Sequence, residues 1–291
     1  MMWLGVVVRA AGRKRSRSIA WLLGDLLNHG VGIRRKLIQD NLARTFPEKT
    51  AADLRQLLNR IYRNQAENII EMLRLPTITS ARDARELVTV DGSALLAKTQ
   101  KNRSGAVLVS AHFGNWELLG LCSGLLVTPL TIVVKPLKNT AIDRQINAWR
   151  MLHGNRIIYD RYALRQGFRA LKNGEILTIL GDQSDPGGSF ITDFLGRRTS
   201  VFLGPAYLAL KADVPLFVGM CRRTGDGRYL VESEEIERSD LTSCREDAEE
   251  LARRYTVVLE RYIRTYPEEW FWFHNRWKRT DPASPLNPPR T

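Results

Sequence analysis

The sequence predicts an α/β protein with a central, mostly parallel mixed sheet flanked by helices, and with a helical region at the N-terminus. Short continuous apolar runs indicate buried strands, and segments with helical spacing of apolar residues lie between them. The alternation of the two patterns is typical of a sheet covered by helices on both faces. The expected strands are Ala106–Val109, Ile132–Val134, Ile176–Leu180, Leu216–Met220 and Tyr229–Glu232.

Residues 1–30 combine apolar and basic segments. Met1–Val8 and Ile19–Leu27 are apolar and flank a cluster of five basic residues. Neither piece approaches the roughly 20 apolar residues that a membrane-spanning helix needs, and the small-residue cleavage site of a secretory signal is missing. The pattern predicts a segment that lies on an anionic membrane surface. An amphipathic helix packed on the rest of the protein fits the same residues equally well.

The remaining helices follow from apolar spacing and from start and stop signals. Thr50 and Asp53 form a capping-box pattern at the start of a long helix that ends near Arg74, before Pro76. The other expected helices are Arg34–Arg44, Trp116–Leu126, Ala141–Leu152, Tyr162–Lys172, Gly204–Lys211 and Ser243–Tyr266. We therefore expect a single domain over residues 31–280, followed by a flexible, proline-rich tail over residues 281–291.

Composition narrows the classes of function. The 291 residues include 44 Lys+Arg and 31 Asp+Glu, a net charge of +13, with a pI of about 10.0. Such a charge favours nucleic acid, anionic lipid or phosphorylated substrates as partners. Three cysteines without CxxC spacing argue against a disulfide framework or a zinc site and favour a reducing compartment. Serine-esterase, Walker A, zincin and dinucleotide-binding motifs are all missing from the sequence.

The first candidate catalytic loop follows the strand at residues 106–109, since chemistry in such sheets lies beyond the carboxyl ends of the strands. His112 comes directly after this strand, and Glu117 follows five positions later, across a turn at Gly114. We expect His112 to act as general base and Glu117 to hold its other ring nitrogen. A histidine with a purely structural hydrogen bond is the alternative reading of this spacing.

A second loop, after Ile176–Leu180, carries Asp182 and Gln183 in a glycine-rich stretch that could contact a ligand, although an ordinary turn fits as well. Lys135 and Arg150 belong to a basic group where solvated surface charge is the default, but a guanidinium near the site could hold a phosphate. Near the C-terminus, Pro267–Arg279 mixes aromatic and basic residues. Three uses fit this segment: a lipid–water interface, stacking on single-stranded nucleic acid, and core packing.

Five blocks in order resemble the bacterial lipid A late acyltransferases (the lauroyl/myristoyl acyltransferases) and, beyond them, the phosphatidylinositol mannoside acyltransferases. The blocks are Asn41–Pro47, His112–Glu117 (H-x4-[D/E]), Lys135–Asn139, Gly181–Gly196 and Pro267–His274. They extend over nearly the whole chain. The block at Lys135 departs from the family, which has arginine there.

The resemblance implies a glycerolipid-acyltransferase-like fold and transfer of a fatty acyl chain from acyl carrier protein or acyl-CoA to a hydroxyl of a glycolipid. The lipid A precursor leads as acceptor, and lysophospholipid or phosphatidylinositol mannoside is the alternative. His112 and Glu117 would be catalytic, and Arg150, Asp182, Gln183 and Lys135 would bind substrate. No metal, no resident cofactor and no nucleic acid is expected. We expect a monomer, peripheral or monotopic, at the cytoplasmic face of the bacterial inner membrane. A nucleic-acid-binding protein is the alternative from another class.

Overall fold

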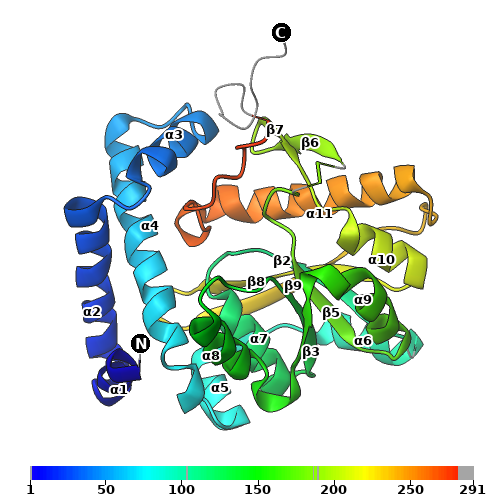
Figure 1. The fold of residues 1–291 in the computed structure, drawn as a ribbon, viewed down its shortest axis with the longest axis horizontal. Helices are drawn as coiled ribbons and strands as arrows, with labels where there is room; N and C mark the ends of the chain where they lie inside the picture. Colours follow the sequence, from blue (N-terminus) through cyan, green and yellow to red (C-terminus); the bar gives the residue numbers. More distant parts are fainter. Residues whose placement is uncertain (1, 103, 186, 189, 281–291) are drawn as a thin grey trace. The chain divides into compact units, whose positions relative to one another are not determined.

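The computed structural model describes residues 2–102, 104–185, 187–188 and 190–280 (Figure 1). The chain divides into two compact units. The first comprises Met1–Thr79 with Arg261–Asn275, and the second comprises Ser80–Glu260 with the described residues from Arg276 on. The predicted boundary at residue 30 does not coincide with this division, and a single domain over 31–280 stays a prediction. The expected tail at 281–291 lies outside the described residues.

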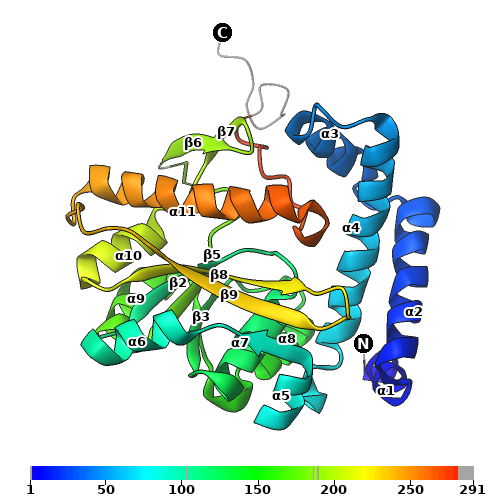
Figure 2. The same ribbon diagram turned by 180° about the vertical axis from the view of Figure 1, so that it is seen from behind.

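The second unit contains a seven-stranded sheet with strand order β1-β9-β8-β2-β5-β3-β4, which confirms the α/β prediction. Its strands are β1 (Val88–Val90), β2 (Ala106–Ser110), β3 (Leu130–Val134), β4 (Arg156–Tyr159), β5 (Ile176–Leu180), β8 (Leu216–Arg223) and β9 (Tyr229–Ile236). All neighbouring pairs are parallel except β8 and β9, which form the long antiparallel pair seen in Figure 2. Strand β2 is buried along its whole length, as its continuous apolar run predicts.

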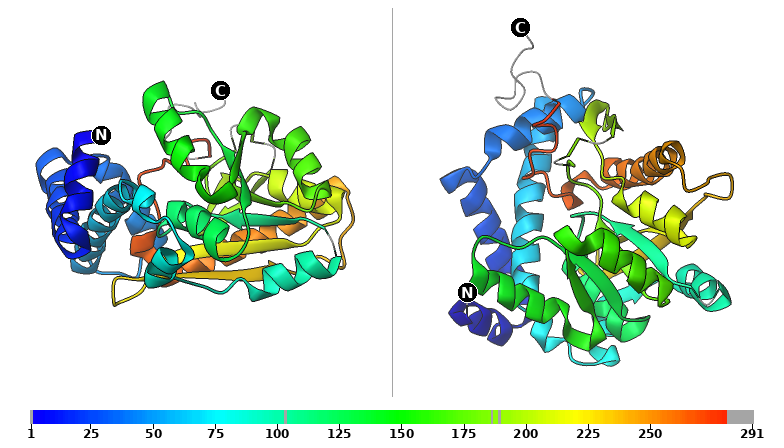
Figure 3. Two further views of the ribbon diagram at one scale, coloured as in Figure 1. Left: turned by 90° about the horizontal axis from the view of Figure 1, so that it is seen from below. Right: turned by 45° about the vertical axis from the view of Figure 1, so that its right-hand side comes forward.

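Helices cover both faces of this sheet (Figure 3). The connections β2–β3 and β3–β4 run one way along the sheet, while β4–β5 and β5–β8 run back. Because such crossovers are right-handed, the two directions place their helices on opposite faces. The helices of this unit are α5 (Ala81–Leu87), α6 (Ser93–Asn102), α7 (Trp116–Leu126), α8 (Thr140–Arg150), α9 (Ala163–Lys172), α10 (Gly204–Ala212) and most of α11 (Arg245–Thr265), with short turns η3 (Leu152–Gly154) and η4 (Asp160–Tyr162).

A separate two-stranded hairpin, β6 (Ile191–Phe194) with β7 (Arg197–Ser200), follows the loop after β5. The described residues after Asn275 pack against it. The Thr280 hydroxyl donates to the Arg198 carbonyl at 2.5 Å, and the Arg197 guanidinium lies 4.0 Å from the Trp277 ring centroid. The hairpin and the last described residues are therefore joined by specific contacts.

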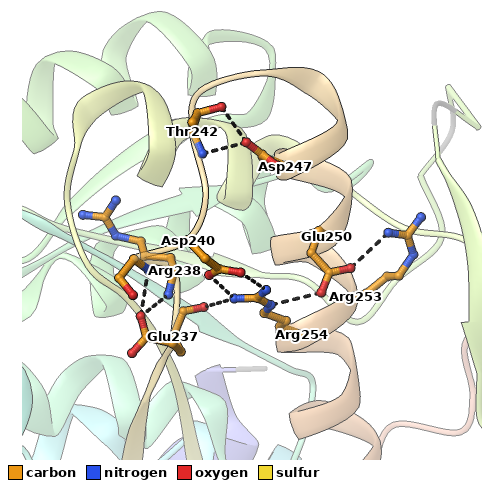
Figure 4. Close-up of polar contacts among 9 residues, drawn as sticks. Glu237, Arg238, Asp240, Thr242, Asp247, Glu250, Arg253 and Arg254 are labelled. Atoms are coloured by element: carbon orange, nitrogen blue, oxygen red, sulfur yellow. Dashed lines mark hydrogen bonds and ion pairs between the residues drawn. The ribbon is translucent and has the colours of Figure 1, made fainter.

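The N-terminal end of α11 is fixed by a charged network (Figure 4). Arg254 donates to both oxygens of Asp240, at 2.7 and 2.6 Å, and to Glu250 at 3.0 Å. Its hydrogen bonds lower the pKa of Asp240 to about 2. Asp247 accepts from the backbone of Thr242 at 2.7 Å. A carboxylate near a helix N-terminus also complements the helix dipole, so the network favours the start of the helix.

The first unit is mainly helical: α1 (Met2–Ala10), α2 (Gly12–Asp25), the π-helical turn η1 (Leu26–Val31), α3 (Arg35–Thr45), α4 (Ala51–Met72), η2 (Leu75–Thr77) and η5 (Pro267–Glu269). The predicted capping box at Thr50 and Asp53 is confirmed in both directions. Helices α2 and α4 pack closely at Gly24, where a Cβ atom would stand 2.7 Å from the Cα of Arg63. Glycine is therefore required at this helix contact.

The aromatic segment near the C-terminus is largely core. Trp270, Trp272 and Trp277 are all buried. Trp272 packs against Phe46 with ring centroids 6.1 Å apart and donates to the Pro267 carbonyl at 2.6 Å. Of the three uses that the sequence left open, the structure shows core packing for these tryptophans. They offer no stacking face for lipid or nucleic acid.

Candidate active site

The two candidate loops lie side by side because their strands pair in register. In the parallel pair β2–β5, Ser110 stands opposite Leu180, and the Gly181 amide continues the ladder by donating to the Ser110 carbonyl at 2.8 Å. His112 and Asp182 each follow two residues after these partners. The register of the sheet therefore brings a histidine and a carboxylate to the same edge.

His112 and Asp182 form a hydrogen-bonded pair. The distance from Nδ1 of His112 to Oδ1 of Asp182 is 2.9 Å. Because an ionised carboxylate only accepts, the proton of the neutral ring lies on Nδ1, and Nε2 keeps its lone pair. The Asp182 side chain is 3% exposed and that of His112 is 23% exposed. A buried carboxylate therefore holds the ring at Nδ1, and part of the His112 side chain stays exposed.

The expectation that Glu117 holds His112 is corrected by this geometry, because Asp182 occupies that place. Glu117 accepts instead from Arg150, whose Nε and Nη2 lie 3.0 and 2.5 Å from its two oxygens, and from Nε1 of Trp116 at 3.2 Å. Burial lowers the pKa of Arg150, but the hydrogen bonds and charge of Glu117 outweigh that effect and raise it overall. Glu117 and Arg150 thus form a partly buried ion pair.

The turn between His112 and Glu117 needs a glycine. Gly114 has φ of 54°, and a Cβ atom there would lie 1.7 Å from the carbonyl oxygen of Cys221. The next amide, of Asn115, donates to that same carbonyl at 3.0 Å. The Asn115 side chain then caps α7 by accepting from the Leu118 amide at 3.1 Å. This turn directs the chain from the base into the helix that carries Glu117.

A pocket of about 710 Å³ opens beside His112. Its wall is mainly apolar and comes from β3, β5, α7, α9 and α10. His112, Glu117, Lys135, Arg150 and Gln183 line the same pocket, so five of the six predicted site residues border one cavity. A concave apolar cavity with a few converging polar groups is the usual form of a small-molecule site.

The remaining predicted residues take distinct places. The Gln183 amide nitrogen lies 3.5 Å from Nε2 of His112, so the amide lies beside the imidazole ring. Lys135 is exposed on the pocket lining after β3. Asp182 was expected to contact substrate, but its carboxylate is turned to His112. Among the described residues, no group of three or more His, Cys, Asp or Glu side chains could hold a metal ion.

An imidazole base beside an apolar cavity has the chemistry needed to activate an alcohol toward an acyl group, and the comparison with known proteins identifies the chain as an acyltransferase. It belongs to the bacterial lipid A biosynthesis acyltransferase family, whose match extends over residues 1–279.

Several characterised relatives align over most of this chain. It is 27% identical to a lipid A biosynthesis lauroyltransferase of Escherichia coli K12, over 88% of this chain and 83% of the relative. It is 26% identical to a phosphatidylinositol mannoside acyltransferase of Mycolicibacterium smegmatis, over 82% and 78%. It is also 26% identical to the E. coli lipid A biosynthesis palmitoleoyltransferase, over 84% and 79%. The similarity therefore spans relatives with two different glycolipid acceptors in their names.

Proposed function

We propose that this protein is a membrane-associated O-acyltransferase that moves a fatty acyl chain from an acyl thioester to a hydroxyl of a glycolipid. The observation that carries the proposal is the His112–Asp182 hydrogen bond, with His112 on the lining of the mainly apolar pocket. The pocket supplies a surface for a hydrocarbon chain, and the pair supplies a base for an alcohol. Transfer to a lipid A precursor is the leading form of the reaction.

In the proposed mechanism His112 handles one proton. Its Nε2 accepts the proton of the acceptor hydroxyl while the hydroxyl oxygen attacks the thioester carbonyl carbon. The carbon–sulfur bond then breaks, and the departing thiolate takes the proton from the imidazolium, which leaves an ester and a free thiol. Asp182 stabilises the imidazolium between these two steps, because its carboxylate lies 2.9 Å from Nδ1. Every group in this mechanism belongs to the chain or to the two substrates.

The other polar groups at the pocket are proposed to bind substrate. Lys135, exposed on the lining, supplies a positive charge for a phosphate of the acceptor. Gln183 is placed to donate to a substrate oxygen next to Nε2 of His112. Glu117 and Arg150 also line the pocket, where their ion pair fixes both side chains. The donor is an acyl carrier protein or coenzyme A thioester, and no metal or resident cofactor takes part.

Membrane association is proposed from the surface of the first unit. Leu22 is 72% exposed, and Trp21, Leu26 and Val31 are exposed around it. Arg15, from the basic cluster, is exposed on the same helix α2. Exposed apolar side chains beside cations favour the surface of an anionic bilayer. Among the described residues no helix is both long and apolar enough to span a membrane, and we propose peripheral or monotopic binding at the cytoplasmic face of the inner membrane.

The test is acyl transfer by the purified full chain in mixed micelles, followed by mass spectrometry of the lipid product. Acyl carrier protein and coenzyme A thioesters of one chain length are compared as donors, with a lipid A precursor, a phosphatidylinositol mannoside and a lysophospholipid as acceptors. His112→Ala should abolish transfer, while Arg82→Ala, at a largely exposed arginine of α5, should leave it unchanged. Full activity of His112→Ala would remove the proposed base.

A phosphatidylinositol mannoside or a lysophospholipid remains the alternative acceptor. The near-equal identities to the lauroyltransferase and to the mannoside acyltransferase, 27% and 26%, favour neither over the other. Mass spectrometry of the host's lipids with and without the protein distinguishes them. The nucleic-acid alternative loses its main support, since the tryptophans proposed to stack on bases are buried.

A further inference from the structure

A buried arginine lies behind the loop that carries Asp182. Arg276 is 1% exposed. Its Nη1 donates to the Ser200 carbonyl at 2.6 Å and to the Thr199 hydroxyl at 2.8 Å, and that hydroxyl donates to the Arg276 carbonyl at 3.1 Å. The guanidinium carbon lies 5.0 Å from the ring centroid of Phe194. These contacts hold the side chain in one position against the β6–β7 hairpin.

This charge is not neutralised nearby. In the part of the chain that the structure describes, no carboxylate lies within ion-pair distance of Arg276, and its buried Nε has no acceptor. Burial lowers the pKa of Arg276 to about 10, against the opposing effect of the Asp182 carboxylate, so the guanidinium stays protonated at neutral pH. A buried cation without a paired anion costs folding free energy. Fold stability alone is therefore a poor reason for an arginine here.

The surroundings of Arg276 connect it to the catalytic loop. The Ser200 hydroxyl donates to the Asp185 carbonyl at 3.0 Å, so the residue that Arg276 binds also holds the loop three positions after Asp182. Tyr255 packs against the start of the same loop, since a Cβ atom built on Gly181 would lie 3.5 Å from the Tyr255 ring. Burial raises the pKa of Tyr255, so its phenol is neutral. The carboxylate whose charge acts on Arg276 is thus that of Asp182.

We propose that Arg276 is a positioning residue for the catalytic pair, and the proposal rests on the function proposed above. Its fixed positive charge keeps Asp182 ionised, and its bond to Ser200 holds the loop that presents this carboxylate to His112. We expect the loss of this positive charge in a variant to make protonation of His112 easier. The Glu117–Arg150 pair, which lines the same pocket as His112, carries no net charge.

The first experiment is a pH profile of kcat/KM for acyl transfer. Arg276→Met keeps most of the side-chain volume and removes the charge. We expect at least a tenfold loss of kcat and an upward shift of the acid limb by about one pH unit, the size expected when a nearby unit charge is removed from a medium of effective dielectric about 20. Arg238→Met, which removes an arginine that pairs with Asp213, should shift nothing. Thr199→Val, which keeps the charge, should leave the limb in place.

The second experiment does not depend on activity. The pKa of the His112 ring is followed by NMR in ¹³C-histidine-labelled protein, with His112→Gln to assign the signal. Arg276→Met should raise this pKa by the same amount as the kinetic shift. A folded Arg276→Met protein with an unchanged His112 titration overturns the proposal, whatever its activity. If Arg276→Met does not fold, Arg276→Gln, which keeps a donor for Ser200, takes its place. A wild-type protein without acyl transfer would refute the proposed function, while the titration would still decide the role of Arg276.

Discussion

Replacing Asp182 by asparagine separates the two carboxylates that could support His112. The substitution keeps the shape of the side chain and removes its charge. An amide can offer its oxygen or its nitrogen to the ring, so the position of the proton on Nδ1 is no longer fixed. The imidazolium also loses its counter-charge. Both effects act on the proton transfer and leave the apolar pocket intact. We therefore expect kcat to fall while KM for the acyl donor stays within a factor of about two.

The size of the loss follows from the geometry. A hydrogen bond of 2.9 Å between Nδ1 and Oδ1 puts the centres of the two charges about 4 Å apart. At an effective dielectric of about 20 this interaction is worth about 4 kcal/mol, which corresponds to about a thousandfold in rate. The value suits a carboxylate that is 3% exposed, because water screens it little. We expect Asp182→Asn to lower kcat by about 10² to 10³.

The matched control is Glu117→Gln, assayed in the same mixed micelles with the same thioester. Its loss leaves the partly buried Arg150 without its counter-charge, so the expected effects are a lower melting temperature and a higher KM. We thus expect Asp182→Asn to lower kcat, and Glu117→Gln to lower the melting temperature and raise KM. The reasoning is refuted if Asp182→Asn transfers acyl groups within threefold of wild type while Glu117→Gln loses a thousandfold.

Three further perturbations test other parts of the structure. Gly204 lines the pocket, and a Cβ atom there would meet no atom within 4 Å. Gly204→Leu should therefore fill part of the pocket and move donor preference to shorter acyl chains, at about 0.8 kcal/mol per excluded CH₂. An unchanged chain-length profile would contradict this. Thr50→Ala removes the acceptor for the Asp53 amide and should cost about 1 kcal/mol in urea unfolding, with unchanged activity per folded molecule. The pKa of Asp240 falls from 3.8 to about 2 through its hydrogen bonds to Arg254, so the pair stabilises the fold fully above pH 4 and ceases to do so as the pH drops to about 2. Arg254→Met should accordingly show a smaller fall in stability between pH 5 and pH 2.5 than wild type, and equal falls would argue against this origin.

The central strands and most helices were predictable because their apolar patterns are long or continuous. Strand β5 matches its predicted range Ile176–Leu180, and α7 matches Trp116–Leu126. The strands that the sequence did not reveal are short or polar. Strand β1 has three residues, and β7 reads Arg-Arg-Thr-Ser. Such strands form because a partner is already in place, which is a tertiary effect that local periodicity cannot report.

The sequence identified the residues of the candidate site, but it did not identify which side chains bond to one another. His112, Glu117 and Asp182 were identified from loops at strand ends, but sequence proximity assigned Glu117 to the histidine. Spatial pairing came instead from the register of β2 with β5, which sets His112 and Asp182 at equal offsets from paired residues. That equal offset could have been noticed once the two strands were assumed to be parallel neighbours. Arg276 was noted only as one of the basic residues in Pro267–Arg279, because the local sequence does not report burial.

The loop that carries His112, the proposed base, is secured by main-chain bonds to two neighbouring strands, one on each side of β2. The Gly181 amide binds the Ser110 carbonyl, and the Asn115 amide binds the Cys221 carbonyl. Neither bond depends on a side chain, so sequence drift around the cavity leaves the imidazole in place. The side chains of α9 and α10 that line the pocket can therefore change in size and polarity while the His112 ring stays in the same position. An enzyme built this way can acquire a new lipid acceptor or a new chain length by altering its walls alone.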